Sequence, residues 1–269
     1  MEIALVVDSS LDTVVRDEFS SAGIQNVKHH VGRNCGAHHR REQGRVHFHL
    51  IPVKLNACSG IPLDRITTNP SSGLGLGLAT LYLSQPNTRV ILTARTNDPS
   101  SILEALPKSY PGTLHGIYNL DSASTTDTIT LRSSLLSPEH KLQKIDIVIA
   151  NAGVGAPFDT ILDAPIDALE QFYRVNALAP VRLYQQLWKD LLENSANPKF
   201  ILSRIEADFG VRWVKTDNGQ AYADAVNVPE PPTEVEASVK AIFQLVSEAT
   251  REGMSGKFID VMSGNELPW

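Results

Sequence analysis

The sequence predicts an α/β fold built on a doubly wound parallel sheet. Three observations favour this fold. Short apolar stretches recur with helical stretches between them, and a glycine-rich segment near residue 70 joins a β-rich stretch to a helix. The run Ile145-Asp-Ile-Val-Ile-Ala150 also reads as a continuous buried strand. Strands that alternate with helices at this spacing form a parallel sheet with helices on both faces.

The individual elements follow from composition and from the spacing of apolar residues. We expect strands at 2–8, 66–68, 88–94, 114–120, 145–150, 199–202 and 257–261. We expect helices at 12–19, 74–83, 101–106, 126–136 and 165–192, the last interrupted near Pro180. A capping box, Thr233-x-x-Glu236, predicts the start of another helix, and its apolar face holds Val235, Val239, Ile242, Phe243 and Val246.

Residues 28–60 interrupt this pattern. They hold six of the eight histidines without a period of 2 or 3.6, which indicates a loop or a poorly ordered segment. We therefore divide the chain into an atypical, partly disordered N-terminal extension, 1–60, and an α/β domain, 61–269. A metal ion is a further hypothesis for the histidines, but the pairs His29/His30 and His38/His39 lack a ligand spacing. A solvated polar loop is the better account, and we predict no metal site.

Charge and composition exclude several classes of protein. The 269 residues include 24 Lys and Arg against 30 Asp and Glu, a net charge of −6, so no broad basic surface for nucleic acid is expected. No apolar run approaches the roughly 18 residues of a membrane span, and Glu2 stands where a signal peptide would be basic. Cys35 and Cys58 make neither a disulfide framework nor a four-ligand zinc site. We expect a soluble, cytoplasmic protein without nucleic-acid or membrane partners.

The strongest local signal is the glycine-rich segment Thr68-Asn-Pro-Ser-Ser-Gly-Leu-Gly75. Glycines let a backbone approach a pyrophosphate, and the N-terminus of the helix that follows favours negative charge. The alternative is a tight turn without a ligand. Asn69 stands where a first glycine would be expected. Asn tolerates a positive φ, whereas Pro70 restricts Asn69 toward extended conformations.

Arg95 indicates which dinucleotide the segment would bind. It follows Gly75 by 20 positions, at the end of the second strand. An acidic residue at about this distance would bind the ribose 2′-hydroxyl of NAD, whereas an arginine suits the 2′-phosphate of NADP. We therefore predict NADP, with NAD the less favoured cofactor. The alternative is a solvated arginine at a strand end.

Together these residues resemble the short-chain dehydrogenase/reductase family. The resemblance rests on the glycine-rich segment, on Leu120-Asp121, on Asp146-Ile-Val-Ile-Ala-Asn-Ala-Gly153 and on Tyr173-Arg-Val-Asn176. The tail, 255–269, is similar to the fungal branch that includes norsolorinic acid ketoreductase. The resemblance covers about 66–203 and 214–269 and implies a Rossmann-like sheet, whereas residues 1–60 match no part of the family.

The resemblance implies a role for each matching residue. In the glycine-rich segment the cofactor would be bound by Asn69, Ser71, Ser72, Gly73, Leu74 and Gly75. Asp121 would face the adenine, and the ribose would lie over Asn151, Ala152 and Gly153. The nicotinamide carboxamide would contact Val214 and Thr216. Asn176 matches a catalytic asparagine that holds a proton-relay water. The plainer alternatives are a helix kink at Asn176 and a strand-end turn at Asp121.

Carbonyl reduction also needs a proton donor beside the hydride acceptor. The family uses a Ser to polarise the carbonyl, a Tyr to donate the proton and a Lys four residues later to lower the pKa of that Tyr. No Tyr-x-x-x-Lys follows the strand at 199–202, since Tyr222 is followed at this spacing by Val226. Tyr184, with Lys189 five residues later, precedes that strand. Ser203, at the strand end, is the candidate serine, although the family's serine normally lies further on.

The same region is too short for the expected topology. Only 12 residues separate Ser203 from Thr216. A crossover to the next parallel strand needs about a dozen residues before that strand begins. One helix–strand unit, the unit that would carry the Tyr and the Lys, is therefore predicted to be missing, and its loss should expose apolar surface on neighbouring elements. A splicing or reading-frame error at both irregular places is an equal alternative.

Two functions from different classes remain open. The first is an NADP-dependent reductase (oxidoreductase) acting on a carbonyl group of a polyketide-like or other secondary metabolite, so that a small ketone or alcohol is the partner. Without a general acid its rate would fall by about 10²–10⁴-fold. The second is a catalytically impaired or inactive dinucleotide-binding protein. The resemblance also allows a homo-oligomer.

Overall fold

The computed structural model describes residues 2–7, 73–95, 98–155, 160–203 and 213–268. The chain divides into two compact units, one made of Met1–Asp12 with Thr67–Trp269 and the other of Thr13–Ile66. The second unit lies outside the described residues, and so do the expected helix at 12–19 and the whole histidine-rich stretch, 28–60. All described elements belong to the first unit.

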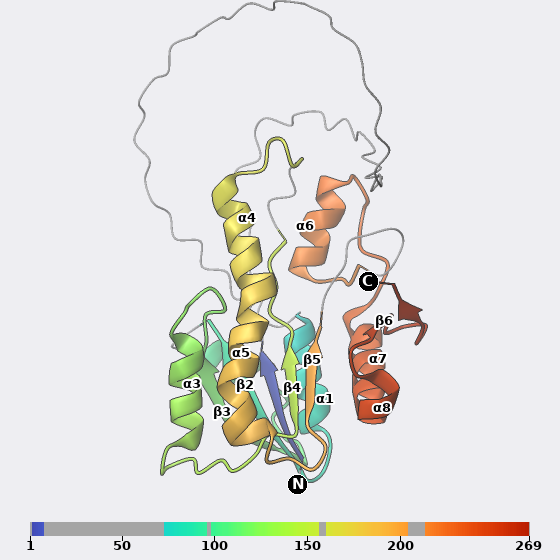
Figure 1. The fold of residues 1–269 in the computed structure, drawn as a ribbon. Coiled ribbons are helices and arrows are strands. Elements are labelled where there is room, and N and C mark those ends of the chain that lie inside the picture. Colours follow the sequence, from blue (N-terminus) through green and yellow to red (C-terminus); the bar gives the residue numbers. More distant parts are fainter. Residues whose placement is uncertain (1, 8–72, 96–97, 156–159, 204–212, 269) are drawn as a thin grey trace, which may run out of the picture. The chain divides into compact units, whose positions relative to one another are not determined.

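Five parallel strands form the central sheet (Figure 1). They are β1 (Glu2–Val7), β2 (Thr88–Ala94), β3 (Thr113–Asn119), β4 (Ile147–Ala150) and β5 (Lys199–Leu202). The order β3-β2-β1-β4-β5 places β1 in the middle with the chain winding outward on both sides, which confirms the doubly wound sheet. Val7 lies opposite both Thr93 and Ala150. The carboxyl ends of the three central strands therefore meet at one edge.

The position of β1 differs from the expected division of the chain at residue 60. We expect residues 1–60 to form an extension, whereas the structure pairs Glu2–Val7 with β2 and with β4. A run of Ile, Ala, Leu and Val suits a parallel strand that is paired on both sides. Strand β1 thus fills the place before the glycine-rich segment that we expect for 66–68, and residues 66–68 lie outside the described residues.

The described part of the chain contains eight α-helices. They are α1 (Leu74–Leu83), α2 (Ser100–Ala105), α3 (Asp127–Leu136), α4 (Ile166–Phe172), α5 (Ala179–Leu187), α6 (Asp217–Ala225), α7 (Val235–Glu248) and α8 (Arg251–Met254). Of these, α1 and α7 cover one face of the sheet and α3 and α5 the other. Helices α1 and α7 share an apolar cluster with Ile149 of β4, and α3 and α5 share another with Val148. Adjacent strand residues thus serve opposite faces, as the strand period of 2 requires. No helix in the described part is long and apolar enough to cross a bilayer.

The expected helix at 165–192 is one helical stretch with two π-helical parts. The part η1 (Tyr173–Leu178) lies between α4 and α5, and η2 (Trp188–Leu192) follows α5. The interruption expected at Pro180 therefore falls slightly earlier, at η1. Pro180 itself lies in the first turn of α5, directly after η1. Because the helical stretch is continuous, its missing N–H group removes a backbone hydrogen bond to the preceding turn. Single π-helical turns often occur at functional sites.

The start of α7 differs from the expected capping box. The N-cap residue is Glu234, and no side chain caps the helix. The N–H group of Thr233 donates to the carbonyl oxygen of Trp213 at 3.0 Å, and its carbonyl oxygen accepts from the N–H group of Lys215 at 2.8 Å. Because Thr233 is held in this β-bridge, the helix starts later. The predicted apolar face is confirmed, since Val239, Ile242 and Val246 are buried.

The parallel sheet of the described part ends at β5, which pairs only with β4. The last expected strand, 257–261, forms the short β6 (Phe258–Ile259), which pairs antiparallel with β7 (Glu266–Leu267) in a separate sheet. A final parallel strand needs a neighbour for its backbone hydrogen bonds, and the helix–strand unit that we predict to be missing would supply one. Leu202 of β5 is 55% exposed, as expected where a covering helix is missing.

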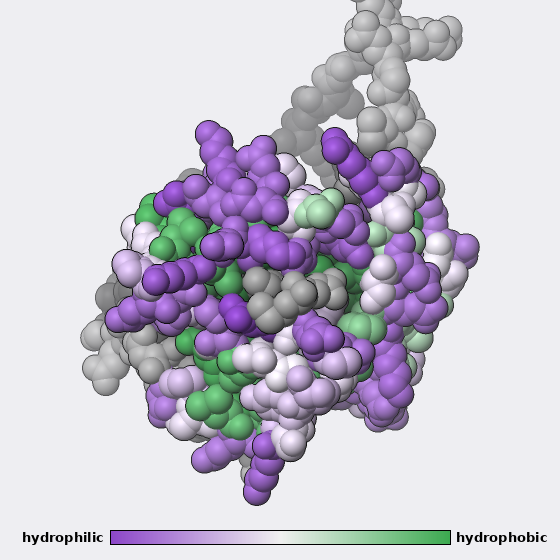
Figure 2. Space-filling view, turned by 90° about the horizontal axis from the view of Figure 1, so that it is seen from below, coloured by the Kyte–Doolittle hydropathy of each residue, from purple (hydrophilic) through white to green (hydrophobic). Residues whose placement is uncertain are grey.

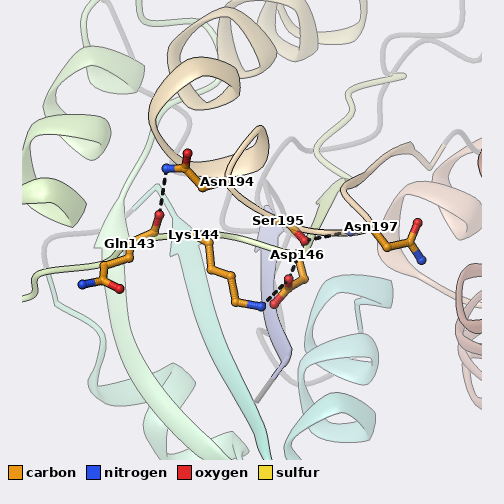
Figure 3. Close-up of polar contacts among 6 residues, drawn as sticks. All are labelled: Gln143, Lys144, Asp146, Asn194, Ser195 and Asn197. Atoms are coloured by element: carbon orange, nitrogen blue, oxygen red, sulfur yellow. Dashed lines mark hydrogen bonds and ion pairs between the residues drawn. The ribbon is translucent and has the colours of Figure 1, made fainter.

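A buried polar cluster joins the first residues of β4 and β5 at the opposite edge (Figure 3). The Oδ1 atom of Asp146 accepts from Oγ of Ser195 at 2.5 Å and from Nζ of Lys144 at 2.7 Å. Its carbonyl oxygen accepts from the N–H group of Lys199 at 2.8 Å. A buried carboxylate is tolerated only when it is paired and hydrogen-bonded. These hydrogen bonds therefore help to fix the register in which β4 and β5 pair.

The contact between α1 and α7 depends on Gly77. A Cβ atom at this position would lie 2.6 Å from Cγ2 of the buried Val239. We expect Gly77→Ala to lower the free energy of unfolding by about 1–3 kcal/mol through overpacking. In the Val239→Ala background the same substitution should cost less, because the clashing methyl group is gone. Chemical denaturation of the two single variants and the double variant measures this coupling. Strictly additive effects would contradict the contact.

Candidate functional site

The candidate site lies at the carboxyl edge of the parallel sheet. An open sheet with this strand order has a crevice where the winding direction reverses, here between β1 and β4. Four predicted site residues, Arg95, Asp121, Asn151 and Ser203, follow the last residues of β2, β3, β4 and β5 by one or two positions. The structure therefore brings residues that are distant in sequence to one edge.

The N-terminus of α1 lies at the same edge. Only four residues separate the end of α1 from the start of β2, so the helix runs antiparallel to the strands. Its N-cap residue is Gly73, no side chain of the described residues caps it, and its first turn contains no acidic residue. The first N–H groups of a helix lack intrahelical partners and carry partial positive charge. They are therefore available to an anionic group. Asn69, Ser71 and Ser72 lie outside the described residues.

Asp121 forms the turn that follows β3. Its Oδ1 atom accepts from the N–H group of Ala123 at 2.8 Å, and its own N–H group donates to Oδ2 of Asp127 at 2.9 Å. Its Oδ2 atom has no hydrogen bond within the described part of the chain. From α5, Nη2 of Arg182 donates to the carbonyl oxygen of Ser122 at 2.7 Å. Sequence reasoning missed Arg182, because no motif marks a contact between such distant residues.

Asn176 holds the segment that follows β4. Its Oδ1 atom accepts from the N–H group of Val154 at 2.9 Å, and its Nδ2 atom donates to the carbonyl oxygen of Val154 at 2.7 Å. Asn176 lies in the π-helical η1, where an extra residue changes the direction of the side chains. Its place at a helical irregularity agrees with the plainer reading of Asn176 as a kink residue, and its side chain positions the backbone beside Asn151–Gly153. The catalytic role of Asn176 stays a prediction.

Val214 and Thr216 form a tight entry into α6. Val214 is buried, and Thr216 caps the helix, since its Oγ1 atom accepts from the N–H group of Gly219 at 3.1 Å. A Cβ atom on Gly219 would lie 2.0 Å from the carbonyl oxygen of Val214. Nδ2 of Asn218 donates to the carbonyl oxygen of Gly153 at 3.4 Å, so this entry contacts the segment after β4. The Thr-x-x-Gly spacing is the signal that could have identified Gly219.

Ser203 and the tyrosines do not assemble a proton-transfer group. The N–H group of Ser203 donates to the carbonyl oxygen of Ala150 at 3.1 Å, which places Ser203 at the correct edge. No tyrosine of the whole sequence has a lysine four residues later. Tyr184 packs between Trp188 and Phe200, with ring centroids 5.2 Å from each, and Tyr222 packs on Trp213 at 4.8 Å. Within the described ranges, no group of three or more His, Cys, Asp or Glu residues could hold a metal ion.

Gly219→Ala tests whether the entry into α6 depends on close backbone packing. We expect it to displace the segment 214–219 and to lower stability by about 1–3 kcal/mol, because the clash is with backbone rather than with a mobile side chain. Gly253→Ala is the matched control. Gly253 occupies the same position after Thr250 in α8, but its added Cβ would meet only the Thr250 hydroxyl, at 2.8 Å. Equal losses in thermal unfolding would contradict this account.

Comparisons with known proteins agree with this geometry. The short chain dehydrogenase family model matches residues 66–198. The short chain dehydrogenase gsfK of Penicillium aethiopicum is 31% identical over an alignment 256 residues long. The alignment covers 78% of this chain and 100% of that protein. The norsolorinic acid ketoreductase of Aspergillus parasiticus is 29% identical over 248 residues, which cover 76% of this chain and 90% of that protein. Since 78% of 269 residues is only about 210, the first relative has residues without counterparts here.

Solved structures support the fold. The NADPH-bound carbonyl reductase from chicken fatty liver superimposes with a TM-score of 0.60 at 18% identity, covering 74% of this chain and 96% of that chain. The carbonyl reductase Sniffer of D. melanogaster gives a TM-score of 0.59 at 20% identity, with the same coverage of both chains. The sequence relatives extend this likeness from fold to family: the chain belongs to the short-chain dehydrogenase family of oxidoreductases.

Proposed function

We propose that this chain binds NADP(H) at the carboxyl edge of its sheet and reduces a carbonyl group of a polyketide-like metabolite, with impaired delivery of the proton. The observation that carries the proposal is the convergence of Arg95, Asp121, Asn151–Gly153 and the N-terminus of α1 at one edge. Relatives named norsolorinic acid ketoreductase support a ketone on an aromatic metabolite as the substrate class.

The residues at this edge fit a phosphorylated dinucleotide. The uncapped N-terminus of α1 is suited to the pyrophosphate, and Arg95, directly after β2, is suited to a ribose 2′-phosphate. The Oδ2 atom of Asp121 remains available as an acceptor for an adenine N–H group. Val214 and Thr216 would hold the carboxamide end. When bound, NADPH supplies the hydride.

Proton delivery is the step for which this chain lacks the usual group. Asn176 already uses both polar atoms of its side chain on Val154, so it positions backbone and does not transfer a proton itself. With no Tyr-x-x-x-Lys in the sequence, water is left as the proton source. Loss of a positioned general acid typically slows such a step by about 10²–10⁴-fold. We therefore expect slow turnover.

A second candidate function is dinucleotide binding without catalysis. It is favoured by the same missing Tyr-x-x-x-Lys and by the packing of Tyr184 and Tyr222 against aromatic neighbours. The two candidates share the cofactor site. They differ only in whether hydride is transferred from NADPH to a carbonyl substrate at a measurable rate.

Binding and turnover with the purified chain distinguish the candidates. NADPH fluorescence should report saturable binding, and 4-deuterated NADPH incubated with an aryl ketone should yield deuterated alcohol at a rate about 10²–10⁴-fold below that of an ordinary family member. Binding without deuterated product would support the second candidate. A rate typical of the family would show that an intact proton donor exists, and absence of NADPH binding would contradict both candidates.

Arg95→Asp tests the choice of cofactor. We expect the dissociation constant for NADPH to rise at least about 10-fold while that for NADH changes little or falls, because the side chain would repel the 2′-phosphate and accept from a 2′-hydroxyl. The control is Arg251→Asp, an equal change of charge at an exposed position in α8. If both variants weaken NADPH and NADH binding equally, Arg95 does not select the phosphate.

A further inference from the structure

Three titratable ring side chains meet at the edge strand β3, beside Arg89 of the neighbouring β2. His115 and Tyr118 of β3 pack against His140, which lies in the loop after α3. The ring of His140 lies 5.3 Å from that of His115 and 5.7 Å from that of Tyr118, measured between centroids. The rings of His115 and Tyr118 stack at 6.4 Å. Arg89, at the start of the neighbouring β2, is close enough for its charge to lower the pKa of His115.

A β-bulge produces this arrangement. Val90 pairs with Leu114, whereas the next residue, Ile91, pairs with Gly116. His115 is therefore an extra residue in β3, and bulges of this kind redirect side chains at sheet edges. Gly116 completes the arrangement, because a Cβ atom there would lie 3.1 Å from the ring of Tyr118. The bulge thus places His115 and Tyr118 together, although a regular strand would put residues three apart on opposite faces.

Three buried atoms in this cluster lack hydrogen-bond partners within the described part of the chain. They are Nε of Arg89, Nε2 of His115 and Oη of Tyr118. Buried polar atoms in folded proteins almost always have a partner, and each exception requires an explanation. Each of the three can be a donor: Nε of Arg89 always, Oη of Tyr118 below its raised pKa, and Nε2 of His115 when it is protonated. A single group with several acceptor oxygens would satisfy all three.

The charges around the cluster favour an anion over a cation. Arg89 forms no ion pair among the described residues, and neither does Glu139, the acidic neighbour of His140 in sequence. Arg132, the cation on α3, is already paired with Asp190. Burial lowers the pKa of His115, and the charges of Arg89 and His140 lower it further. The positive charge of Arg89 disfavours a metal ion on the two histidines.

We propose that Arg89, His115, Tyr118 and His140 form a binding site for a small oxyanion, such as sulfate, phosphate or a carboxylate group. The site lies along β3, from His115 to Tyr118, beside Arg89 near the start of β2. It shares no residue with the proposed cofactor site, whose residues follow the last residues of these strands. On the face of the molecule seen from below, hydrophobic residues form small separate patches among hydrophilic ones (Figure 2).

Inorganic sulfate is the appropriate probe, because its charge does not change between pH 5 and 8. Histidine NMR of the full chain, with His115 assigned through His115→Gln, should show that millimolar sulfate raises the pKa of His115 relative to chloride at equal ionic strength. Sulfate should bind at least about 5-fold more tightly at pH 5.5 than at pH 7.5, since binding and protonation of His115 favour each other. Arg89→Gln should weaken sulfate binding about 10-fold, whereas Arg251→Gln should leave it unchanged.

The stability of the protein supplies an independent readout. Because the pKa of folded His115 lies below its ordinary value of 6.5, the unfolded chain binds this proton first, and the free energy of unfolding should fall as the pH drops below about 6.5. Sulfate should reduce that loss in the wild type and in Arg95→Asp, but not in Arg89→Gln. Tyr118→Phe removes only one donor and should give an intermediate effect, which keeps the test valid if a histidine variant fails to fold.

Two results would overturn the proposal. One is a pKa of His115 that responds equally to sulfate and to chloride, which would mean that water satisfies the three atoms. The other is an equal loss of sulfate binding in Arg89→Gln and Arg251→Gln, which would mean an adventitious ion only.

Discussion

The pairing of β1 with both β2 and β4 is the constraint on which the candidate site depends. It brings the ends of β1, β2 and β4 into register, so that Val7, Thr93 and Ala150 lie opposite one another. Arg95 and Asn151 then follow at the same edge, next to the N-terminus of α1. The site is therefore a product of the sheet order and not of any one motif. Gly77 adds the close packing of α1 on α7 that holds this helix against the sheet.

Local patterns predicted most of the described elements well. Helix α1 and strands β2 and β5 have the expected bounds, because apolar spacing and the glycine-rich segment mark them locally. Local sequence patterns gave the wrong structure where a residue pairs with a partner that is distant in the sequence. Thr233 caps no helix because it pairs with Trp213 and Lys215, and β6 leaves the parallel sheet for a pairing with β7. The central position of β1 in the sheet could not be predicted either, because many residues separate β1 from α1 in the sequence.

In the candidate site, too, local patterns predicted some residues, whereas contacts between distant residues could not be predicted. Strand-end residues could be assigned from order and spacing, since parallel strands end at a common edge. The hydrogen bonds of Asn176 to Val154 and of Arg182 to the Ser122 carbonyl join residues that are far apart in the sequence, and Asn176 lies in a π-helical stretch that no local pattern predicts. The bulge at His115 is likewise invisible in sequence. The predicted absence of a helix–strand unit after β5 would account for three observations: the exposed Leu202, the antiparallel pairing of β6 with β7 and the lack of a Tyr-x-x-x-Lys motif.

Hydrogen exchange with and without NADPH tests the central claim most directly, because it reports where the dinucleotide contacts the backbone. If the carboxyl edge holds the cofactor, NADPH should slow exchange in peptides covering 73–76, 151–154 and 214–219, and leave the bulged strand β3 around His115 unchanged. No protection in these peptides, or protection confined to other parts of the chain, would contradict the account.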